Sequence, residues 1–556
     1  PMIPRAVVYA HRVPRPGPGN IYRTALSAVA ADQAAPAAGD GSLEAAIART
    51  WAQVLGVERV APDDDFFALG AQSLQAIQVA NRLGVELGRD VRVAWLFQHP
   101  TAAGLARRLE HHAEAAATAP ATTPATTHAS ASATAHASAS ATAPASASAA
   151  THASASAAGP ASALALPAAV LAAAVLADGV RPAGRTRTTG GPRTVLLTGA
   201  TGFVGPHLLA ELLRVTDAEI VCPVRAATPA EAADRVRAAL AAQRIPLPAG
   251  ADRITALPAD LARPHLGLGA GRFAELARTC DAIVHNAATV SILRDYASLR
   301  AANTESTRQL LTLASARTIP LHLVSTLSVA PARDRAPEVP EAFQPPHPGL
   351  VSGYQQSKWA AERLLEQAAE RGFPVTVHRL GRVTGAPDTG QVNRRDFLWS
   401  VLASGVPAGI VPELFEAEVW TPADYVARAV VRLSLTAAPG TVFNHAPVAP
   451  VRLADVYDWV QEYGYPVKRI PAAQWRRELP RAADVAVTTG AFFDSFPADG
   501  EEGPELGLGH VRADHVLRGL EGTGIVCPRA DRALVFRYLD HCVENGILPP
   551  PAEGDV

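Results

Sequence analysis

A glycine-rich segment constrains the fold of residues 164–556 more than any other feature of this sequence. It reads TVLLTGATGFVGPHLLAELL and places Gly199, Gly202 and Gly205 at intervals of three residues between an apolar run and a helical pattern. This order is typical of the first strand, turn and helix of a nucleotide-binding βαβ unit, because glycines let the backbone approach a pyrophosphate at the helix N-terminus.

Further apolar runs alternate with amphipathic segments after this turn. EIVCPVR, AIVHNAA, LHLVSTLSV and VTVHRLG are short, rich in β-branched residues and separated by helical patterns. The alternation predicts an α/β fold of Rossmann type, in which helices cover a parallel sheet.

Composition divides the rest of the chain, which at 556 residues is too long for one core. Residues 40–111 carry three amphipathic helical patterns, the last with Thr101 as its expected N-cap, and predict a small helical bundle. Residues 112–163 consist mainly of Ala, Thr, Ser, His and Pro. Such a segment lacks the large apolar residues that offset chain entropy, so we expect a disordered linker. Its histidines lack cysteine or acidic partners, and we expect no metal site.

Ser73 follows an acidic and aromatic turn at the start of the second helical pattern. A serine there is a plausible N-cap. The stretch DDDFFALGAQSLQA also resembles the attachment site of peptidyl carrier domains in nonribosomal peptide synthetases, with Ala71 and Gln72 departing from the usual glycine and His or Asp. The resemblance implies covalent 4′-phosphopantetheine on Ser73, added by a phosphopantetheinyl transferase, and a helix N-terminus suits its phosphodiester.

Residues 1–28 resemble the closing segment of an adenylation domain, with Gly19-Asn20 where that family has a Gly-Lys pair. We therefore expect upstream synthetase domains and a remnant that cannot adenylate by itself. No signal peptide opens the sequence.

The glycine spacing is similar to that of short-chain dehydrogenase/reductases, and this resemblance implies a nicotinamide cofactor. Arg225 ends the second predicted strand, where an NAD enzyme has an acidic residue; a guanidinium there pairs with a 2′-phosphate and favours NADPH. Arg235 is expected to assist, while a plain surface role for Arg225 stays open. The resemblance implies further cofactor contacts at Thr201, Phe203, Val204, Asp260, Leu261, Asn286, Ala287 and Ala288.

Only two of the 50 basic residues are lysines, and one of them, Lys358, lies four residues after Tyr354 in SGYQQSKWAAE. On a helix these two side chains share a face. In the short-chain reductase pattern, Thr326 orients a carbonyl oxygen, Tyr354 supplies a proton and Lys358 lowers the pKa of the phenol and holds the nicotinamide ribose. Asn303 is a further candidate, for a water relay. We expect Lys358→Arg not to be conservative.

Residues 165–548 resemble the terminal thioester reductase domains of nonribosomal peptide synthetases. We expect HRLGRVTG (378–385), VWTPADYVARAVVRLS (419–434) and the C-terminal GTGIVCPRADRALVFRYLDHCVENGILPPP to build a smaller substrate-binding subdomain. The resemblance implies reduction of a carrier-bound acyl or peptidyl thioester to an aldehyde, or further to an alcohol. Three alternatives stay open: a redox-inactive domain that releases its product by cyclisation, an extended short-chain enzyme acting on sugar nucleotides, and a carrier that only docks.

The net charge and the distribution of the cysteines limit the kinds of partner that we expect for this chain. The formal net charge of −2 gives no basic field for nucleic acid or anionic lipid, and the four cysteines are scattered. The alanine-dominated stretch 161–180 is interrupted by Pro167 and predicts a short helix rather than a membrane span. We expect a cytoplasmic protein that binds neither nucleic acid nor membrane.

Overall fold

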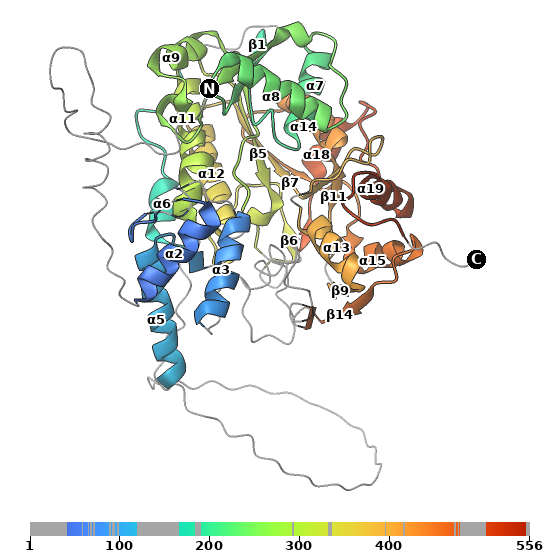
Figure 1. Cartoon of the computed structure of the whole chain (residues 1–556). Coiled ribbons are helices and arrows are strands. Elements are labelled where there is room, and N and C mark those ends of the chain that lie inside the picture. Colours follow the sequence, from blue (N-terminus) through green and yellow to red (C-terminus); the bar gives the residue numbers. More distant parts are fainter. Residues whose placement is uncertain are drawn as a thin grey trace, which may run out of the picture. The chain divides into compact units, whose positions relative to one another are not determined.

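The computed structural model describes residues 42–118, 166–183, 191–478 and 508–551, apart from short gaps within these ranges. The chain forms two compact units, Pro1–Ala119 and Pro120–Val556 (Figure 1). The expected adenylation remnant and most of the expected linker lie outside the described residues.

The first unit contains three helices among its described residues: α2 (Leu43–Leu55), α3 (Ser73–Leu87) and α5 (Ala102–Thr118). Its core includes Trp51 and Phe66, which are fully buried with ring centroids 4.6 Å apart. This arrangement confirms the expected helical bundle.

The ends of these helices follow local capping chemistry. Ser42 caps α2 by accepting a hydrogen bond from the backbone of Ala45. The Thr101 hydroxyl accepts from Gly104 N at 3.1 Å, which confirms the expected cap of α5. At its other end α5 continues to Thr118, past the expected linker boundary at residue 112, because its alanine-rich last turns favour helix.

Seven strands of the second unit form one parallel sheet. Their order across the sheet is that of a doubly wound nucleotide-binding fold. In that order they are β12 (Thr441–His445), β7 (Val375–Leu380), β5 (Leu321–Thr326), β4 (Ala282–His285), β1 (Thr194–Thr198), β2 (Glu219–Val224) and β3 (Ile254–Pro258).

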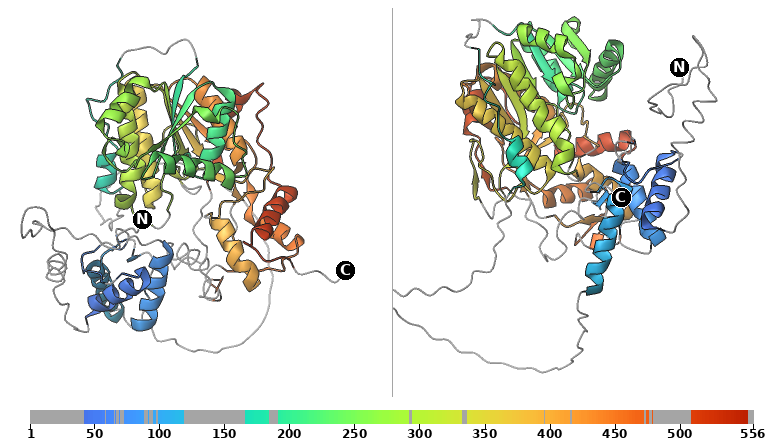
Figure 2. Two further views of the ribbon diagram at one scale, coloured as in Figure 1. Left: turned by 45° about the horizontal axis from the view of Figure 1, so that its top comes forward. Right: turned by 90° about the vertical axis from the view of Figure 1, so that its left-hand side faces the viewer.

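Helices cover both faces of this sheet, as the views of Figure 2 show. Alternation along β1 sends Val195 and Leu197 into one core and Leu196 into the other. The first core is completed by α7 (Gly205–Val215), α8 (Pro229–Ala242), α14 (Ala423–Thr436) and α18 (Asp514–Leu520). The second is completed by α9 (Ala270–Thr279), α11 (Ser306–Ser315) and α12 (Gly353–Glu370).

A separate core identifies the smaller C-terminal subdomain. It packs α13 (Phe397–Ala408), α15 (Leu453–Glu462) and α19 (Arg532–Glu544) around residues such as Trp420 and Tyr538. Our assignment of 378–385 and 419–434 to this subdomain is wrong for residues 378–380 and for residues 423–434. His378 to Leu380 end β7 of the main sheet, and α14 packs on α7, because its buried apolar face matches the helix layer of that sheet.

Short elements connect these layers. They are α6 (Ala168–Ala173), η1 (Ala251–Arg253), η2 (Pro264–Gly267), α10 (Tyr296–Arg300), η3 (Ala301–Glu305), η4 (Leu327–Val329), β6 (Glu338–Val339), β8 (Arg382–Thr384), β9 (Ile410–Pro412), β10 (Ala417–Glu418), β11 (Trp420–Pro422), β13 (Val451–Arg452), β14 (Lys468–Ile470) and β15 (His510–Val511).

The alanine-rich segment after residue 161 forms only α6, which begins after Pro167 and packs Val170 against Trp359 of α12. Among the described residues, no helix has the length and apolar character needed to cross a membrane.

Two buried histidines link the edge strand β12 to β7. His378 Nδ1 and His445 Nε2 are 3.1 Å apart, and both side chains are fully buried. Burial lowers the pKa of His445 from 6.5 to about 3, and it lowers the pKa of His378 as well, with the neighbouring histidines adding to the shift.

We predict that acid destabilises this domain through His378 and His445. The unfolded chain takes up protons near pH 6.5, whereas the folded chain keeps both rings neutral, so stability falls as the pH drops below that value. Each buried histidine should add about 1.4 kcal/mol per pH unit to the slope of the unfolding free energy. Denaturant unfolding of the wild type and His445→Gln at several acidic pH values measures this slope, and equal slopes would contradict the prediction.

Candidate functional site

The glycine turn joins β1 to α7 and forces the backbone into close contact. Gly199 has a φ of +72°, and a Cβ there would lie 2.7 Å from the nitrogen of Ala287, which follows β4. A Cβ on Gly205 would lie 2.0 Å from the carbonyl oxygen of Gly199. Only glycine fits either position, so the sequence requirement and the structure agree.

The same turn leaves an open approach at the start of α7. Gly202 is exposed, and a Cβ on it would meet only the oxygen of Gly199, at 3.4 Å. The side chain of the N-cap residue Val204 has no hydrogen-bonding atom, so it leaves the first amides of the helix uncapped. Free amides and the helix dipole favour a phosphate group, so these residues fit a dinucleotide.

Residues after β4 lock this turn in place. The Asn286 side chain donates a hydrogen bond to the Gly199 carbonyl at 3.2 Å, and Ala287 N donates to the Thr198 hydroxyl at 3.1 Å. The predicted residues Asn286 and Ala287 therefore lie beside the glycines, with Ala288 next along the chain.

The predicted adenosine-side residues follow the neighbouring strands. Arg225 is exposed directly after β2, and Arg235 of α8 donates a hydrogen bond to the backbone carbonyl of Arg225. Asp260 follows β3, forms an ion pair with Arg263 at 3.3 Å and is adjacent to the half-buried Leu261. Parallel strands end at one edge of the sheet, so these residues share that edge with the glycine turn.

Thr326 and Tyr354 meet at the end of β5. Thr326 is the last residue of β5, and Tyr354 lies in the first turn of α12, where Ser352 and Gln355 form a capping box. Burial raises the pKa of the Tyr354 phenol to about 12, and the neighbouring Thr326 hydroxyl opposes part of this shift. The phenol is therefore protonated at neutral pH and can act as a proton donor.

Lys358 lies one turn further along α12 and is 2% exposed. Its Nζ donates to the backbone carbonyl of Val324 at 2.8 Å. Burial lowers the pKa of Lys358 to about 8, while the carboxylate of Glu362 raises it. Our expectation that this lysine would lower the pKa of Tyr354 is wrong for this structure, because burial dominates both groups.

Asn303 lies in a five-residue π-helix, η3, that precedes α11. Its Oδ1 accepts from Thr289 N at 2.7 Å, and its Nδ2 donates to Thr289 O and to the Ser357 hydroxyl, both at 3.0 Å. Both amide hydrogens are thus committed to protein atoms. Through these contacts Asn303 links the loop after β4 to α12.

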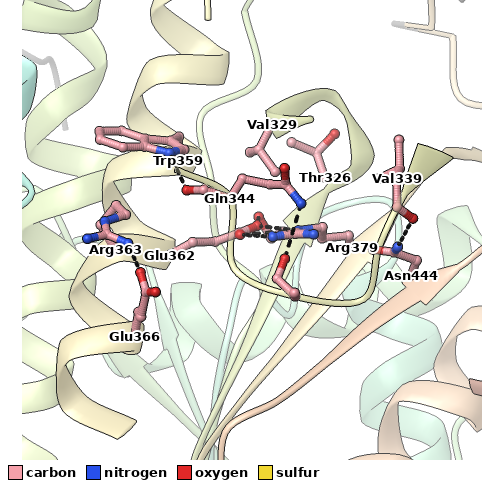
Figure 3. Close-up of polar contacts among 12 residues, drawn as sticks. Thr326, Val329, Val339, Gln344, Trp359, Glu362, Arg363, Glu366, Arg379 and Asn444 are labelled. Carbon is pink, nitrogen blue, oxygen red and sulfur yellow. Dashed lines mark hydrogen bonds and ion pairs between the residues drawn. The ribbon is translucent and has the colours of Figure 1, made fainter. Parts of the chain in front are cut away.

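An ion pair that the sequence analysis missed joins α12 to β7. Arg379 of β7 binds Glu362 of α12 at 2.7 Å, and Figure 3 shows their side chains facing each other near Thr326. The Ser325 hydroxyl donates to the same carboxylate at 2.5 Å. The only sequence signal for Glu362 is its place four residues after Lys358, and no local pattern points to Arg379.

The predicted attachment residue Ser73 is the first residue of α3. This position at the helix start agrees with the sequence prediction. The turn residues 70–72 before it lie outside the described residues.

Comparison with known proteins connects both units to described families. Residues 197–430 match the model described as "Male sterility protein", and residues 45–109 match the model described as "Phosphopantetheine attachment site". The chain is 58% identical to an isonitrile lipopeptide synthase of Streptomyces coeruleorubidus over 99% of its own length and 36% of that protein. It is 30% identical to a glycine betaine reductase of Emericella nidulans over 91% of its length and 38% of the relative. The chain thus spans little more than a third of either relative.

Two solved structures share the fold. A thiolation-reductase di-domain from an archaeal nonribosomal peptide synthetase superposes with a TM-score of 0.61 over 91% of this chain and 98% of that chain, at 20% identity. The terminal R domain from the myxalamid PKS-NRPS biosynthetic pathway is 37% identical, with a TM-score of 0.64, and the match covers 69% of this chain and 99% of that domain.

The chain belongs to the terminal reductase family of nonribosomal peptide synthetases. It is an oxidoreductase whose reductase domain binds a nicotinamide dinucleotide and whose carrier domain bears covalent phosphopantetheine. The structure agrees with the expected fold in three parts: the Rossmann-type sheet, the C-terminal subdomain and the preceding carrier bundle.

We predict that Gly205→Ala disrupts the dinucleotide site of the reductase domain. The new Cβ would collide with the backbone of Gly199 and Ala200, which cannot rotate away. Overpacking of this kind costs about 1–3 kcal/mol. Fluorescence titration should therefore show NADPH binding weakened by about fivefold to a hundredfold. Gly271→Ala in α9 is the control, since its Cβ would meet nothing within 4 Å; equal losses in both variants would contradict the prediction.

Proposed function

We propose that this chain releases a carrier-bound acyl or peptidyl thioester reductively, as an aldehyde, with NADPH as the reductant. The observation that carries the proposal is the meeting of Thr326, Tyr354 and Lys358 at the same sheet edge as the glycine turn, in a chain whose preceding domain carries a phosphopantetheine attachment site.

NADPH supplies a hydride to the carbonyl carbon of the thioester. Thr326 at the end of β5 and Tyr354 in the first turn of α12 would both contact the carbonyl oxygen and orient the thioester. As negative charge develops on that oxygen, the protonated phenol of Tyr354 donates its proton. Lys358, held by the Val324 carbonyl, would supply a positive charge near the site and contact the nicotinamide ribose.

The products follow from the electron count. Addition of hydride and a proton to the C=O group gives a hemithioacetal, still attached to the pantetheine sulfur. Cleavage of its C–S bond returns a proton to sulfur and yields an aldehyde and a free pantetheine thiol. A second hydride and proton would convert the aldehyde to an alcohol.

The covalent connection between the carrier domain and the reductase domain favours delivery of the thioester to the reductase site. Because carrier and reductase belong to one chain, the thioester reaches the reductase as an intramolecular substrate at high effective concentration. The name of the glycine betaine reductase, a relative that aligns with most of this chain, also supports reductive chemistry. The presence of Tyr354 supports reduction, since it offers the proton donor that hydride addition to a carbonyl requires.

The proposal predicts that the holo carrier is deacylated only with oxidation of NADPH. A phosphopantetheinyl transferase would load a panel of acyl-pantetheines, from acetyl to dodecanoyl, onto Ser73 of the full chain. We expect aldehyde in the product mass spectrum and a matching loss of NADPH absorbance. Tyr354→Phe should lower the hydride-transfer rate at least about a hundredfold, the usual contribution of general acid catalysis, and leave NADPH affinity nearly unchanged.

Three results of this experiment would contradict the proposal. Acyl release without NADPH oxidation would indicate hydrolysis or cyclisation. Full turnover by the Tyr354→Phe variant would show that Tyr354 does not donate the proton. Unchanged loading of the Ser73→Ala variant would show that phosphopantetheine attaches to another residue.

We predict that Arg225 selects NADPH over NADH. A charge-assisted hydrogen bond to the 2′-phosphate contributes about 1.5–3 kcal/mol, so Arg225→Ala should weaken NADPH binding about tenfold to a hundredfold and leave NADH binding unchanged. Arg237→Ala on the same side of the domain is the control, because Arg237 is exposed and pairs with Asp234. Equal loss of both cofactors, or none, would leave Arg225 a plain surface residue.

A further inference from the structure

Three ionisable side chains of α12 lie four residues apart along one face of the helix. Tyr354 and Lys358 belong to the proposed reaction, and Glu362 continues the same row one turn deeper. Glu362 is 2% exposed, so its carboxylate is removed from water. Burial of a carboxylate is unfavourable unless the carboxylate is paired with a positive charge and hydrogen-bonded.

Partners from two strands fix the Glu362 carboxylate. Arg379 of β7, which is fully buried, donates from Nη2 at 2.7 Å and from Nε at 3.1 Å. The Ser325 hydroxyl of β5 donates at 2.5 Å. Ser325 lies between Val324, whose carbonyl binds Lys358, and Thr326. The carboxylate is thus tied to the strand that positions both other members of the site.

Stability alone does not account for this cluster. Among the described residues, Arg379 Nη1 is buried and has no hydrogen-bond partner. A buried ion pair is often no more stable than apolar residues of similar size, and an unsatisfied donor makes this one less favourable still. The cluster is therefore better explained by what it does to its neighbour Lys358.

We propose that Glu362, held by Ser325 and Arg379, is a positioning residue that keeps Lys358 charged and aligns α12 with the strand carrying Thr326. The inference rests on the proposed reductive function. It assigns the carboxylate no contact with substrate or cofactor.

Among the described residues, Glu362 is the negatively charged group that acts on Lys358. The other ionisable neighbours are neutral or positively charged. His285 of β4 is neutral, because burial and the charge of Lys358 lower its pKa to about 3. Tyr354 is neutral below about pH 12. Arg379 of β7 adds a positive charge that is paired with Glu362. Burial lowers the pKa of Lys358, and Glu362 is the group that opposes this shift.

The sign of the pH effect follows from these charges. In the wild type, Lys358 loses its proton as the pH rises through about 8, so reduction should decline above that pH. Without the Glu362 carboxylate, desolvation acts unopposed and the decline should begin at lower pH. An opposite charge at close range typically changes a pKa by about one to three units, so the expected shift is at least about one pH unit.

The test compares single-turnover oxidation of NADPH by the full chain, loaded with hexanoyl-pantetheine, across neutral and alkaline pH. Glu362→Gln should shift the alkaline decline down by at least about one pH unit. Glu362→Asp keeps a carboxylate, so its decline should lie close to that of the wild type. Glu366→Gln is the matched control, one turn further along α12, because Glu366 pairs with the partly exposed Arg363 (Figure 3). Its decline should coincide with that of the wild type.

A second variant covers the case in which Glu362→Gln leaves Arg379 uncompensated and the chain fails to fold. Glu362→Gln combined with Arg379→Gln removes both buried charges and should show a downward shift that is smaller than that of Glu362→Gln alone, because the positive charge of Arg379 is also lost. A folded variant lacking the carboxylate, with the wild-type pH profile, would overturn the inference. A wild-type chain that oxidises no NADPH with any acyl-pantetheine would instead overturn the proposed function.

Discussion

Parallel pairing of β4 with β1 and β5 is the interaction on which both halves of the site depend. It brings the ends of the three strands to one edge of the sheet. The close approach of Gly199 to Ala287 is possible only in that register, and the end of β5 then presents Thr326 to Tyr354. The dinucleotide turn and the proton donor are therefore not independent features. Both are consequences of one strand arrangement.

Burial is the second organising constraint, and it acts on charge. Along α12 the row of Tyr354, Lys358 and Glu362 runs from a partly buried side chain to two buried ones. Desolvation raises the pKa of the phenol and lowers that of the ammonium group. A compact ammonium with one backbone acceptor fits such a place, whereas a guanidinium would bring donors that need further partners. This explains why an arginine-rich chain keeps a lysine here.

Sequence patterns predicted the parts of this site that depend on local geometry. The glycine turn, five strands of the sheet, the helix start at Ser73 and the shared face of Tyr354 and Lys358 all follow from spacing along the chain. The direction of the tyrosine pKa shift could not be predicted, because it depends on burial by distant segments. The same holds for Glu362, whose partners Ser325 and Arg379 lie 37 and 17 positions away. The strand β12 and the packing of α14 on α7 likewise depend on tertiary contacts.

The π-helix η3 makes the spacing of this site sensitive to chain length. A π-turn holds one residue more than an α-turn, and here that widened turn places Asn303 and Thr304 against Ser357 of α12. Loss of a single residue would let this turn close as regular α-helix, and the backbone that presents Asn303 and Thr304 to Ser357 would be lost. Homologous chains can therefore vary residue types in this helix more freely than its number of residues, so an alignment gap at Ala301–Glu305 would mark a rebuilt site rather than neutral drift.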